Sequence, residues 1–184
     1  MHSIFAQLTE EHTGTVVDVE VIGSMLAGSL TVGDDSFKVG DCVYIDPNPR
    51  AEGEDRPPTP RAQMIIACIY SILQDKHNLE QFTITAQHYI HPHQTFHKQG
   101  MRFSAREVLK TNTSHTYSKS QIVGRCYVLF HKDYVRGVPH QKSARVSMAD
   151  VYCCENRYNE AAKTITKIKL WNTCLPESCK VHSS

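Results

Sequence analysis

The chain has 184 residues, of which 40% are hydrophobic and 21% charged, a composition typical of an ordinary folded domain. Its 20 basic and 19 acidic side chains nearly cancel, which leaves a formal charge of +1. A dedicated DNA-binding domain carries a marked basic excess, because phosphate neutralisation supplies its affinity. We therefore expect DNA to be an auxiliary partner at most, and nothing in the composition indicates a membrane protein.

The cysteines indicate a reducing compartment. They form an odd set without regular spacing: Cys42, Cys68, Cys126, Cys153, Cys154, Cys174 and Cys179. The first residues lack the basic start and long apolar run of an export signal. We expect the cysteines to be small core residues, and we expect Cys126 and Cys153, which lie inside expected strands, to be packed and unreactive. Because the sequence also lacks a Gly-x-Ser-x-Gly elbow and a phosphate-binding glycine loop, we expect no enzyme.

The first third of the chain predicts an extension, a hairpin and a loop. Residues 1–28 form a weakly patterned extension, in which residues 16–22 alternate like a strand. Around Gly33, residues 29–39 predict a hairpin, and the run from Cys42 to Ile45 is rich in β-forming residues. Five of the eight prolines follow, so residues 47–61 predict a surface loop inserted between strands, without a function of its own.

The rest of the chain predicts more short strands. The apolar run from Met64 to Leu73 predicts a central strand covered on both faces, with Gln81 to Ile90 as its antiparallel neighbour. Further expected elements are strands over 106–109, 124–130, 150–155 and 164–171, a polar loop over 111–119 with a helical turn beginning at Ser118, a helical turn over 132–137, and a polar tail over 172–184. We predict a mainly β fold: a distorted antiparallel β-barrel with peripheral strands and a few short helical turns.

A histidine-rich corner follows the strand that ends at Ile90, and it has two interpretations. The corner contains His88, His91, His93 and His97. These imidazoles either bind a metal ion or form the rim of the barrel, where rings face a partner. Pro92 indicates a bend between His91 and His93, and no glutamate follows before Glu107, so we favour the rim and expect no metal and no cofactor.

Five motifs in order resemble the bromo-adjacent homology (BAH) domain. They are residues 37–45, 89–95, 107–108, 122–128 and 150–159. The resemblance covers about residues 29–171 and is greatest to the BAH domains of polybromo-type chromatin-remodelling subunits, with those of yeast RSC subunits next. It implies a distorted β-barrel with peripheral strands, no catalysis, a nuclear setting and protein contacts on chromatin, often with histone tails.

The same resemblance bears on methyl-lysine recognition. Where the family reads methylated lysine, it uses an aromatic cage, because a quaternary ammonium is attracted to π faces. The cage positions correspond to Tyr44, His88 and Ile90, so only one of three keeps an aromatic ring. We expect that this domain does not read methyl-lysine through the usual cage.

The resemblance implies docking on a histone or nucleosome, or on other remodeller subunits, with no small-molecule substrate. Candidate contact residues at the rim are Tyr44, His88, Tyr89, His91, His93 and the expected turn Asn156, Arg157, Tyr158 and Asn159. If residues 163–169 form a strand, Lys163, Lys167 and Lys169 share one face, which either contacts nucleic acid weakly or protects an edge strand against pairing. A metal-binding barrel and a purely architectural domain remain as alternatives.

Overall fold

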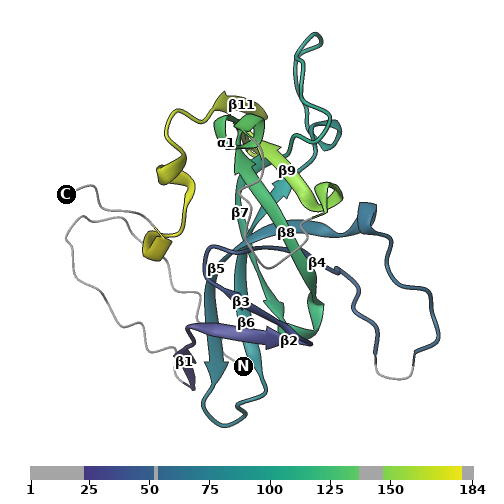
Figure 1. Ribbon diagram of the computed structural model, residues 1–184, viewed down its shortest axis with the longest axis vertical. Helices are drawn as coiled ribbons and strands as arrows, with labels where there is room; N and C mark the ends of the chain where they lie inside the picture. The colour runs from purple at the N-terminus through teal and green to yellow at the C-terminus, as the bar shows by residue number, and fades with distance from the viewer. Residues whose placement is uncertain (1–22, 52–53, 137–146, 180–184) are drawn as a thin grey trace.

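The computed structural model describes residues 23–51, 54–136 and 147–179 (Figure 1). The strands of the first half are β1 (Ser24–Leu26), β2 (Ser29–Val32), β3 (Asp35–Lys38), β4 (Cys42–Ile45), β5 (Ile65–Asp75) and β6 (Phe82–Ile90). Those of the second half are β7 (Leu109–Ser118), β8 (Ile122–Phe130), β9 (Val151–Cys154), β10 (Asn156–Asn159) and β11 (Thr164–Lys167). The strand expected over residues 16–22 lies outside the described residues.

Short helical turns connect these strands. They are α1 (His131–Arg136) and the 3-10 turns η1 (Arg61–Gln63), η2 (Pro92–Gln94), η3 (Lys119–Gln121), η4 (Met148–Asp150), η5 (Trp171–Cys174) and η6 (Glu177–Cys179). The expected turn after Ser118 is η3, where the Ser118 backbone N–H donates to the Gln121 side chain at 3.0 Å. No helix in the described ranges is both long and apolar enough for a membrane span.

One curled mixed sheet forms the body of the domain, which confirms the mainly β prediction. The strand order is β11-β10-β7-β6-β5-β4-β8-β9, and β1 pairs with the end of β5. Two ladders, β7 with β10 and β8 with β9, are parallel, so the sheet is not purely antiparallel. The sheet curls until β9 reaches the residues that lead into β7: Val108 N–H donates to the Cys153 carbonyl at 2.8 Å.

Strand β5 lies at the centre of the sheet and contributes to the core on both faces. Ile66 and Cys68 belong to one buried cluster, whereas Ala67 and Ile69 belong to the other. The prediction of a central strand covered on both faces is confirmed, as is its antiparallel pairing with β6. The expectation that cysteines are core residues also holds, because five of the seven are buried.

The β2–β3 hairpin lies over β5 and β6 (Figure 1), as a small separate sheet. Its two-residue turn contains Gly33 in the left-handed region, with φ of 58°, the conformation that a tight hairpin turn requires. Leu30 and Phe37 point from the hairpin into the cluster that contains Ile69. The predicted hairpin is therefore confirmed, and it covers one face of the main sheet.

Several elements differ from the sequence prediction. Residues 111–119, expected as a polar loop, belong mostly to β7, and residues 156–159, expected as a turn, form β10. The last strand ends at Lys167, well before residue 171, and β1 was not expected. In β7 the backbone pairs with β6 while much of its outer face is exposed, so polar side chains are compatible with the strand.

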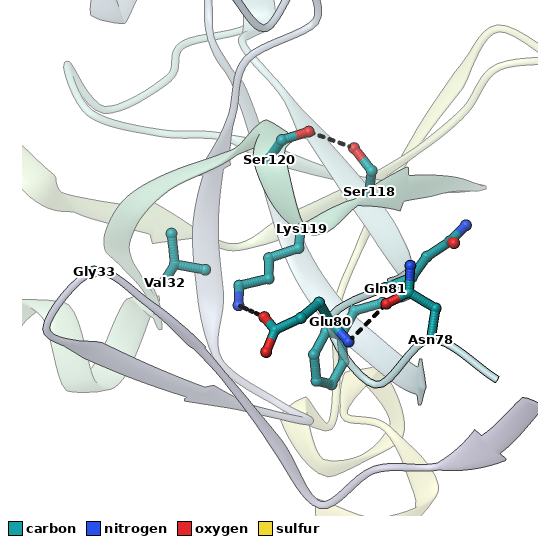
Figure 2. Close-up of a pocket in the computed structure, with 9 residues that line it drawn as sticks. Val32, Gly33, Asn78, Glu80, Gln81, Ser118, Lys119 and Ser120 are labelled. Carbon is teal, nitrogen blue, oxygen red and sulfur yellow. Dashed lines mark hydrogen bonds and ion pairs between the residues drawn. The ribbon is translucent and has the colours of Figure 1, made fainter. Parts of the chain in front are cut away.

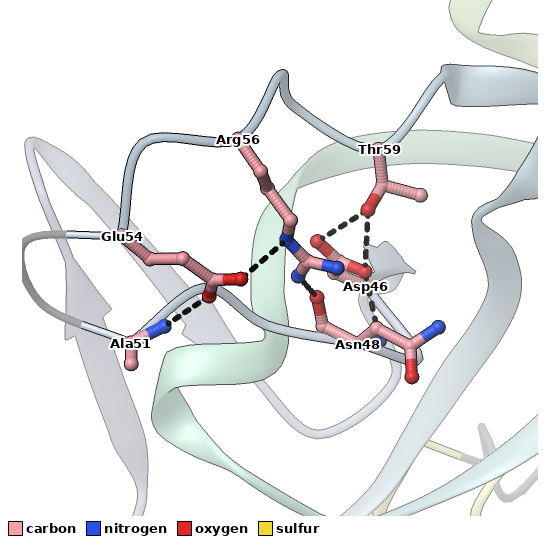
Figure 3. Close-up of polar contacts among 6 residues, drawn as sticks. All are labelled: Asp46, Asn48, Ala51, Glu54, Arg56 and Thr59. Carbon is pink, nitrogen blue, oxygen red and sulfur yellow. Dashed lines mark hydrogen bonds and ion pairs between the residues drawn. The ribbon is translucent and has the colours of Figure 1, made fainter.

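The proline-rich segment lies between β4 and β5, as expected, and its base is held by polar contacts (Figure 3). The buried carboxylate of Asp46 accepts from the Thr59 hydroxyl and from the Asn48 backbone N–H, each at 2.9 Å. Arg56 bridges the segment, because it contacts Glu54 at 3.4 Å and also donates to the Asn48 carbonyl. These contacts fix how the loop leads into η1, which carries Arg61.

Candidate functional site

Two tyrosines, two arginines and one aspartate meet where the sheet curls closed. We call this set the tyrosine–arginine cluster: Tyr44 from β4, Arg61 from η1, Arg106, Asp150 from η4 and Tyr152 from β9. Its members come from four separate stretches of the chain, since Asp150 and Tyr152 are neighbours in sequence, and the fold brings these stretches together. Tyr44 is the one member that sequence analysis had selected.

The hydroxyl groups of the cluster form a directed chain. Tyr44 donates to Asp150 Oδ1 at 3.0 Å, so the contact of 3.1 Å between the tyrosine hydroxyls is donated by Tyr152. Asp150 Oδ1 also forms an ion pair with Arg61 Nη1 at 2.6 Å. Burial, reinforced by the hydrogen bond with Tyr152, raises the pKa of Tyr44 well above its ordinary value. The phenol therefore stays protonated, as its donor role requires.

Each ring of the pair already holds a cation from the same chain. The Arg61 guanidinium carbon lies 5.0 Å from the centroid of Tyr44, and that of Arg106 lies 4.7 Å from the centroid of Tyr152. Arg106 is fixed further by donating from Nε to the Val151 carbonyl at 2.6 Å. The Tyr44 side chain is almost inaccessible, since only 2% of the residue is exposed.

Two histidines of the corner extend the cluster toward solvent. The ring of His91 lies edge-on to Tyr152 at 6.0 Å, and exposed His93 stacks on His91 at 5.3 Å. Pro92 bends the chain between them in η2, as expected. Burial and the positive charges of His93 and Arg106 lower the pKa of His91, which favours its neutral form.

The other two histidines lie elsewhere. His88 stacks on His115 at 4.6 Å and hydrogen-bonds to Tyr117, and burial next to His115 lowers its pKa to about 4. His97 bonds through Nδ1 to Thr95 at 3.0 Å. The four imidazoles thus occupy three environments, and no group of three or more metal-ligating side chains is arranged to hold an ion in the part of the chain that the structure describes.

The three positions related to the aromatic cage do not face one another. Tyr44 and Tyr89 belong to one buried cluster, whereas His88 contacts Tyr117, which packs against the other. Because neighbouring residues of a strand point to opposite faces, Ile90 lies on the same face of β6 as His88. This geometry offers no shared pocket to a methylated lysine.

The candidate residues of β10 make internal contacts. Asn156 donates to Glu107 at 2.8 Å, Arg157 to the Cys174 sulfur at 3.2 Å, and the Tyr158 hydroxyl accepts from the Phe96 backbone N–H at 3.3 Å. These contacts tie β10 to the segments before β7 and after β11. Tyr89 is buried, and the Lys110 ammonium lies 5.4 Å from the centroid of its ring.

The three lysines do not all lie on one strand, so the condition for their sharing one strand face is not met. Lys163 stands in the turn before β11 with φ of 53°, and its ammonium lies 5.4 Å from the ring of Phe96. Lys167 lies on β11 and pairs with Glu155 at 2.6 Å, whereas Lys169 follows the strand. Since β11 has only four residues, the strand cannot carry all three.

The structure also contains cavities that the sequence did not indicate, among them one beside the β2–β3 turn and one beside β10. Figure 2 shows the larger, of about 530 Å³, between the β2–β3 turn and the β5–β6 turn, where Lys119 and Glu80 approach within 4.0 Å. The second, of about 400 Å³, lies between β5, β6 and β7 on one side and β10 and β11 on the other. Lys110 and Arg157 line it, and the only signal for Lys110 was a lysine directly after the apolar pair Val108 and Leu109.

One curled mixed sheet, with the tyrosine–arginine cluster where its ends approach, defines a half-barrel domain. Comparison with models of known protein families assigns this half-barrel to one family. The BAH domain model matches residues 35–169, and the chain belongs to this family. The resemblance found in the sequence motifs is thereby confirmed.

Relatives and a solved structure agree with this assignment. The chromatin structure-remodeling complex subunit rsc1 of Schizosaccharomyces pombe is 31% identical over 149 residues, which is 81% of this chain and 17% of that protein. Subunit RSC2 of Saccharomyces cerevisiae is 38% identical over 92 residues, 50% of this chain and 10% of that protein. The crystal structure of the yeast Rsc2 BAH domain matches with a TM-score of 0.66 and 26% identity, covering 87% of this chain and 62% of that one.

A more distant relative is the histone-lysine N-methyltransferase ash1 of Drosophila melanogaster, which is 26% identical over 152 residues, 77% of this chain and 7% of that protein. The chain spans less than a fifth of each of these three curated relatives. The similarity to remodeller subunits nevertheless confirms the expected kinship with RSC-type BAH domains.

Proposed function

We propose that this domain is a non-catalytic protein-interaction module of a nuclear chromatin-remodelling subunit, which docks on a histone or nucleosome or on a fellow subunit. The names of the RSC relatives support the chromatin setting. The surface that we assign to docking is the exposed side of the tyrosine–arginine cluster together with His91 and His93.

The observation that carries this proposal is that Arg61 is exposed and yet held in a fixed position. Its side chain is 56% exposed, yet it is held by the ion pair with Asp150 and by the ring of Tyr44. A free arginine loses conformational entropy when a partner immobilises it, whereas a side chain that is already fixed avoids much of this cost. Arginine and tyrosine are among the residue types enriched in the few positions that dominate binding energy at interfaces.

The test compares two arginines in matched surroundings. Arg125 pairs with Asp41 at 2.8 Å and lies 4.9 Å from the ring centroid of Phe37, but it belongs to a different region of the sheet. We expect Arg61→Gln to weaken binding to reconstituted nucleosomes or to histone octamer by about tenfold in fluorescence anisotropy, and Arg125→Gln to leave it unchanged. Equal affinities for both variants and the unmodified domain would contradict docking through this surface.

The same assay separates the partners and the alternatives. Binding to histone octamer but not to nucleosomes points to a histone face that DNA covers, and binding to neither directs the search to isolated remodeller subunits. A purely architectural domain binds none of them. A metal-binding barrel would retain an ion after washing with chelator, which elemental analysis detects.

Methyl-lysine recognition is tested with histone H3 and H4 peptides. Because Arg61 and Arg106 already occupy the two tyrosine rings, we expect trimethylated and unmodified peptides to bind with affinities that differ by less than tenfold. A tenfold preference for a methylated peptide would show that the rings exchange their internal cations for the ligand.

DNA is proposed as an auxiliary contact only, through Lys163, Lys167 and Lys169. If all three lysines contact phosphates, the logarithm of the DNA affinity should fall with the logarithm of the salt concentration with a slope of about −3. A salt-independent affinity would remove DNA from the proposal.

A further inference from the structure

The cavity of about 400 Å³ beside β10 has a cationic lining. Its walls are formed by Tyr70, Gln87, Lys110, Thr111, Asn112, Arg157, Tyr158, Asn159, Thr164 and Thr166. No aspartate or glutamate is among these residues. The two charged side chains, Lys110 and Arg157, are therefore both positive, and they are register partners on neighbouring strands.

A bulge in β7 contributes Thr111 and Asn112 to the wall of this cavity. Gln87 pairs with Ser114 and Tyr89 with Lys110, so residues 111–113 lie opposite His88 alone. Such a bulge bends its strand and turns side chains away from regular alternation. The Thr111 hydroxyl holds the bulge by donating to the His88 carbonyl at 3.1 Å.

Lys110 is a buried cation without a carboxylate partner among the described residues. Only 4% of it is exposed, and its ammonium donates to the Tyr70 hydroxyl at 2.9 Å. The Tyr70 hydroxyl donates its own hydrogen bond to the Cys174 carbonyl at 3.0 Å, so its oxygen acts as the acceptor for Lys110. Burial lowers the pKa of Lys110, and an incoming carboxylate would raise it again.

Gln87 supplies a hydrogen-bond acceptor to the same cavity. Its Nε2 donates to the Thr111 carbonyl at 2.9 Å, which fixes the orientation of the amide. Its Oε1 is buried and has no hydrogen-bond partner among the residues that the structure describes. A buried acceptor without a donor costs free energy, so a ligand that brings an N–H group to this oxygen gains affinity.

The cationic lining continues beyond this cavity. A neighbouring cavity of about 260 Å³ shares Arg157 and Thr166 with it and is lined also by Lys167 and Lys169. Because the two cavities share lining residues on β10 and β11, we consider them together and call them the cationic groove. Strand β11 is the edge of the main sheet, so the groove lies open to an extended chain.

We propose that the cationic groove binds an acidic, extended segment of a protein partner, with one carboxylate beside Lys110 and Arg157 and a neighbouring backbone N–H directed at Gln87 Oε1. A peptide offers both groups within one or two residues. Nucleic acid is less suitable for the inner cavity, because phosphates are bound by exposed cations along a surface, whereas Lys110 is only 4% exposed. This inference rests on the proposed docking function, but it uses residues outside the tyrosine–arginine cluster.

The experiment uses two fluorescein-labelled peptides, one of alternating glycine and glutamate and one of alternating glycine and glutamine. We expect the glutamate peptide to bind in anisotropy titrations at low salt and the glutamine peptide to bind at least tenfold more weakly. Arg157→Gln should weaken binding of the glutamate peptide by about tenfold. Arg125→Gln, outside the groove, should leave it unchanged.

A second variant tests the interior of the cavity without removing Lys110. Gln87→Glu keeps the size of the side chain but adds a carboxylate, which would compete with the ligand for the same cations, so we expect at least a tenfold loss. The fluorescence of Trp171, the single tryptophan, reports in urea whether each variant remains folded.

The inference is overturned if both peptides bind equally, if neither variant changes the affinity, or if a short DNA duplex binds more tightly than the glutamate peptide in an Arg157-dependent manner. These results do not depend on Arg61. Failure of the nucleosome test with selective glutamate-peptide binding would therefore contradict the rim surface while supporting the cationic groove.

Discussion

Replacing Tyr44 by phenylalanine tests the hydrogen-bond chain that closes the curled sheet. The substitution keeps the ring and its contact with Arg61 but removes the hydroxyl that donates to Asp150 and accepts from Tyr152. Asp150 keeps its ion pair with Arg61, so it remains partnered. The hydroxyl of Tyr152, in a residue that is largely buried, loses its acceptor.

The expected loss of stability follows from these two changes. Removing one hydrogen-bond partner while the other stays buried costs about 1–3 kcal/mol, which is more than the net value of a single satisfied bond. We therefore expect Tyr44→Phe to lower the free energy of unfolding by about 2 kcal/mol. Adding Tyr152→Phe should cost little more, because the orphaned hydroxyl is then gone, and the coupling between the two sites should be about 1 kcal/mol.

The assay is urea unfolding followed by the fluorescence of Trp171, which stacks on Phe130 at 5.5 Å and so reports the packed state. Tyr127→Phe is the matched control, since the Tyr127 hydroxyl on β8 makes no hydrogen bond in the described structure, and its cost should stay within about 0.5 kcal/mol. A loss for Tyr44→Phe no greater than for the control, or strictly additive losses in the double variant, would refute the reasoning.

Three further predictions concern other parts of the fold. Acidification from pH 6.5 toward 4 should destabilise the domain. The folded pKa of His88, about 4, lies below the ordinary 6.5, so the unfolded chain binds more protons in this range. In urea titrations, His88→Gln should reduce the pH dependence of the unfolding free energy by about 1 kcal/mol. Gly40→Ala should cost about 2 kcal/mol, because φ is 93° and the new Cβ would lie 2.5 Å from Cys179 Sγ; Cys179→Ala should restore only the steric part. Glu107→Gln should cost about 1–2 kcal/mol of unfolding free energy, since the buried carboxylate accepts from Asn156 at 2.8 Å and from a backbone N–H at 3.0 Å.

Strands with an apolar pattern were predictable from the sequence. The run that became β5 has buried positions on both faces, and the β2–β3 hairpin carries a glycine where the turn needs positive φ. Strand β7 gave no such signal, because its last seven residues include no buried position and its sequence is almost wholly polar. Its pairing with β6 is made by backbone groups, which hydrophobic periodicity does not register.

The candidate docking residues were less predictable than the fold. Arg61, Arg106 and Asp150 come from segments without periodic pattern, and they meet because β9 hydrogen-bonds to the residues before β7. Motif resemblance selected Tyr44 as a cage and rim position, but it could not show that the ring is already covered by Arg61. Lys110 was not selected as a candidate site residue, because a single lysine beside apolar residues is typical of a strand end at the surface.

Both proposed surfaces lie at breaks in strand register. The pairing of β4 with β8 shifts after Tyr44, that of β5 with β6 shifts at Tyr70, and that of β6 with β7 shifts over residues 111–113. At Tyr70 the consequence is visible in the core: Tyr70 packs with Cys68 on one face, whereas Ile72, which regular alternation would place there too, packs on the other. Because of this bulge, Tyr70 points toward Lys110, and Ile72 packs in the core on the opposite face of the sheet. The face to which a strand residue points is assigned from a sequence by assuming that side chains alternate between the two faces of the sheet. That assignment fails at breaks in register, and here such breaks occur at Tyr44, at Tyr70 and at the β7 bulge beside the cationic groove.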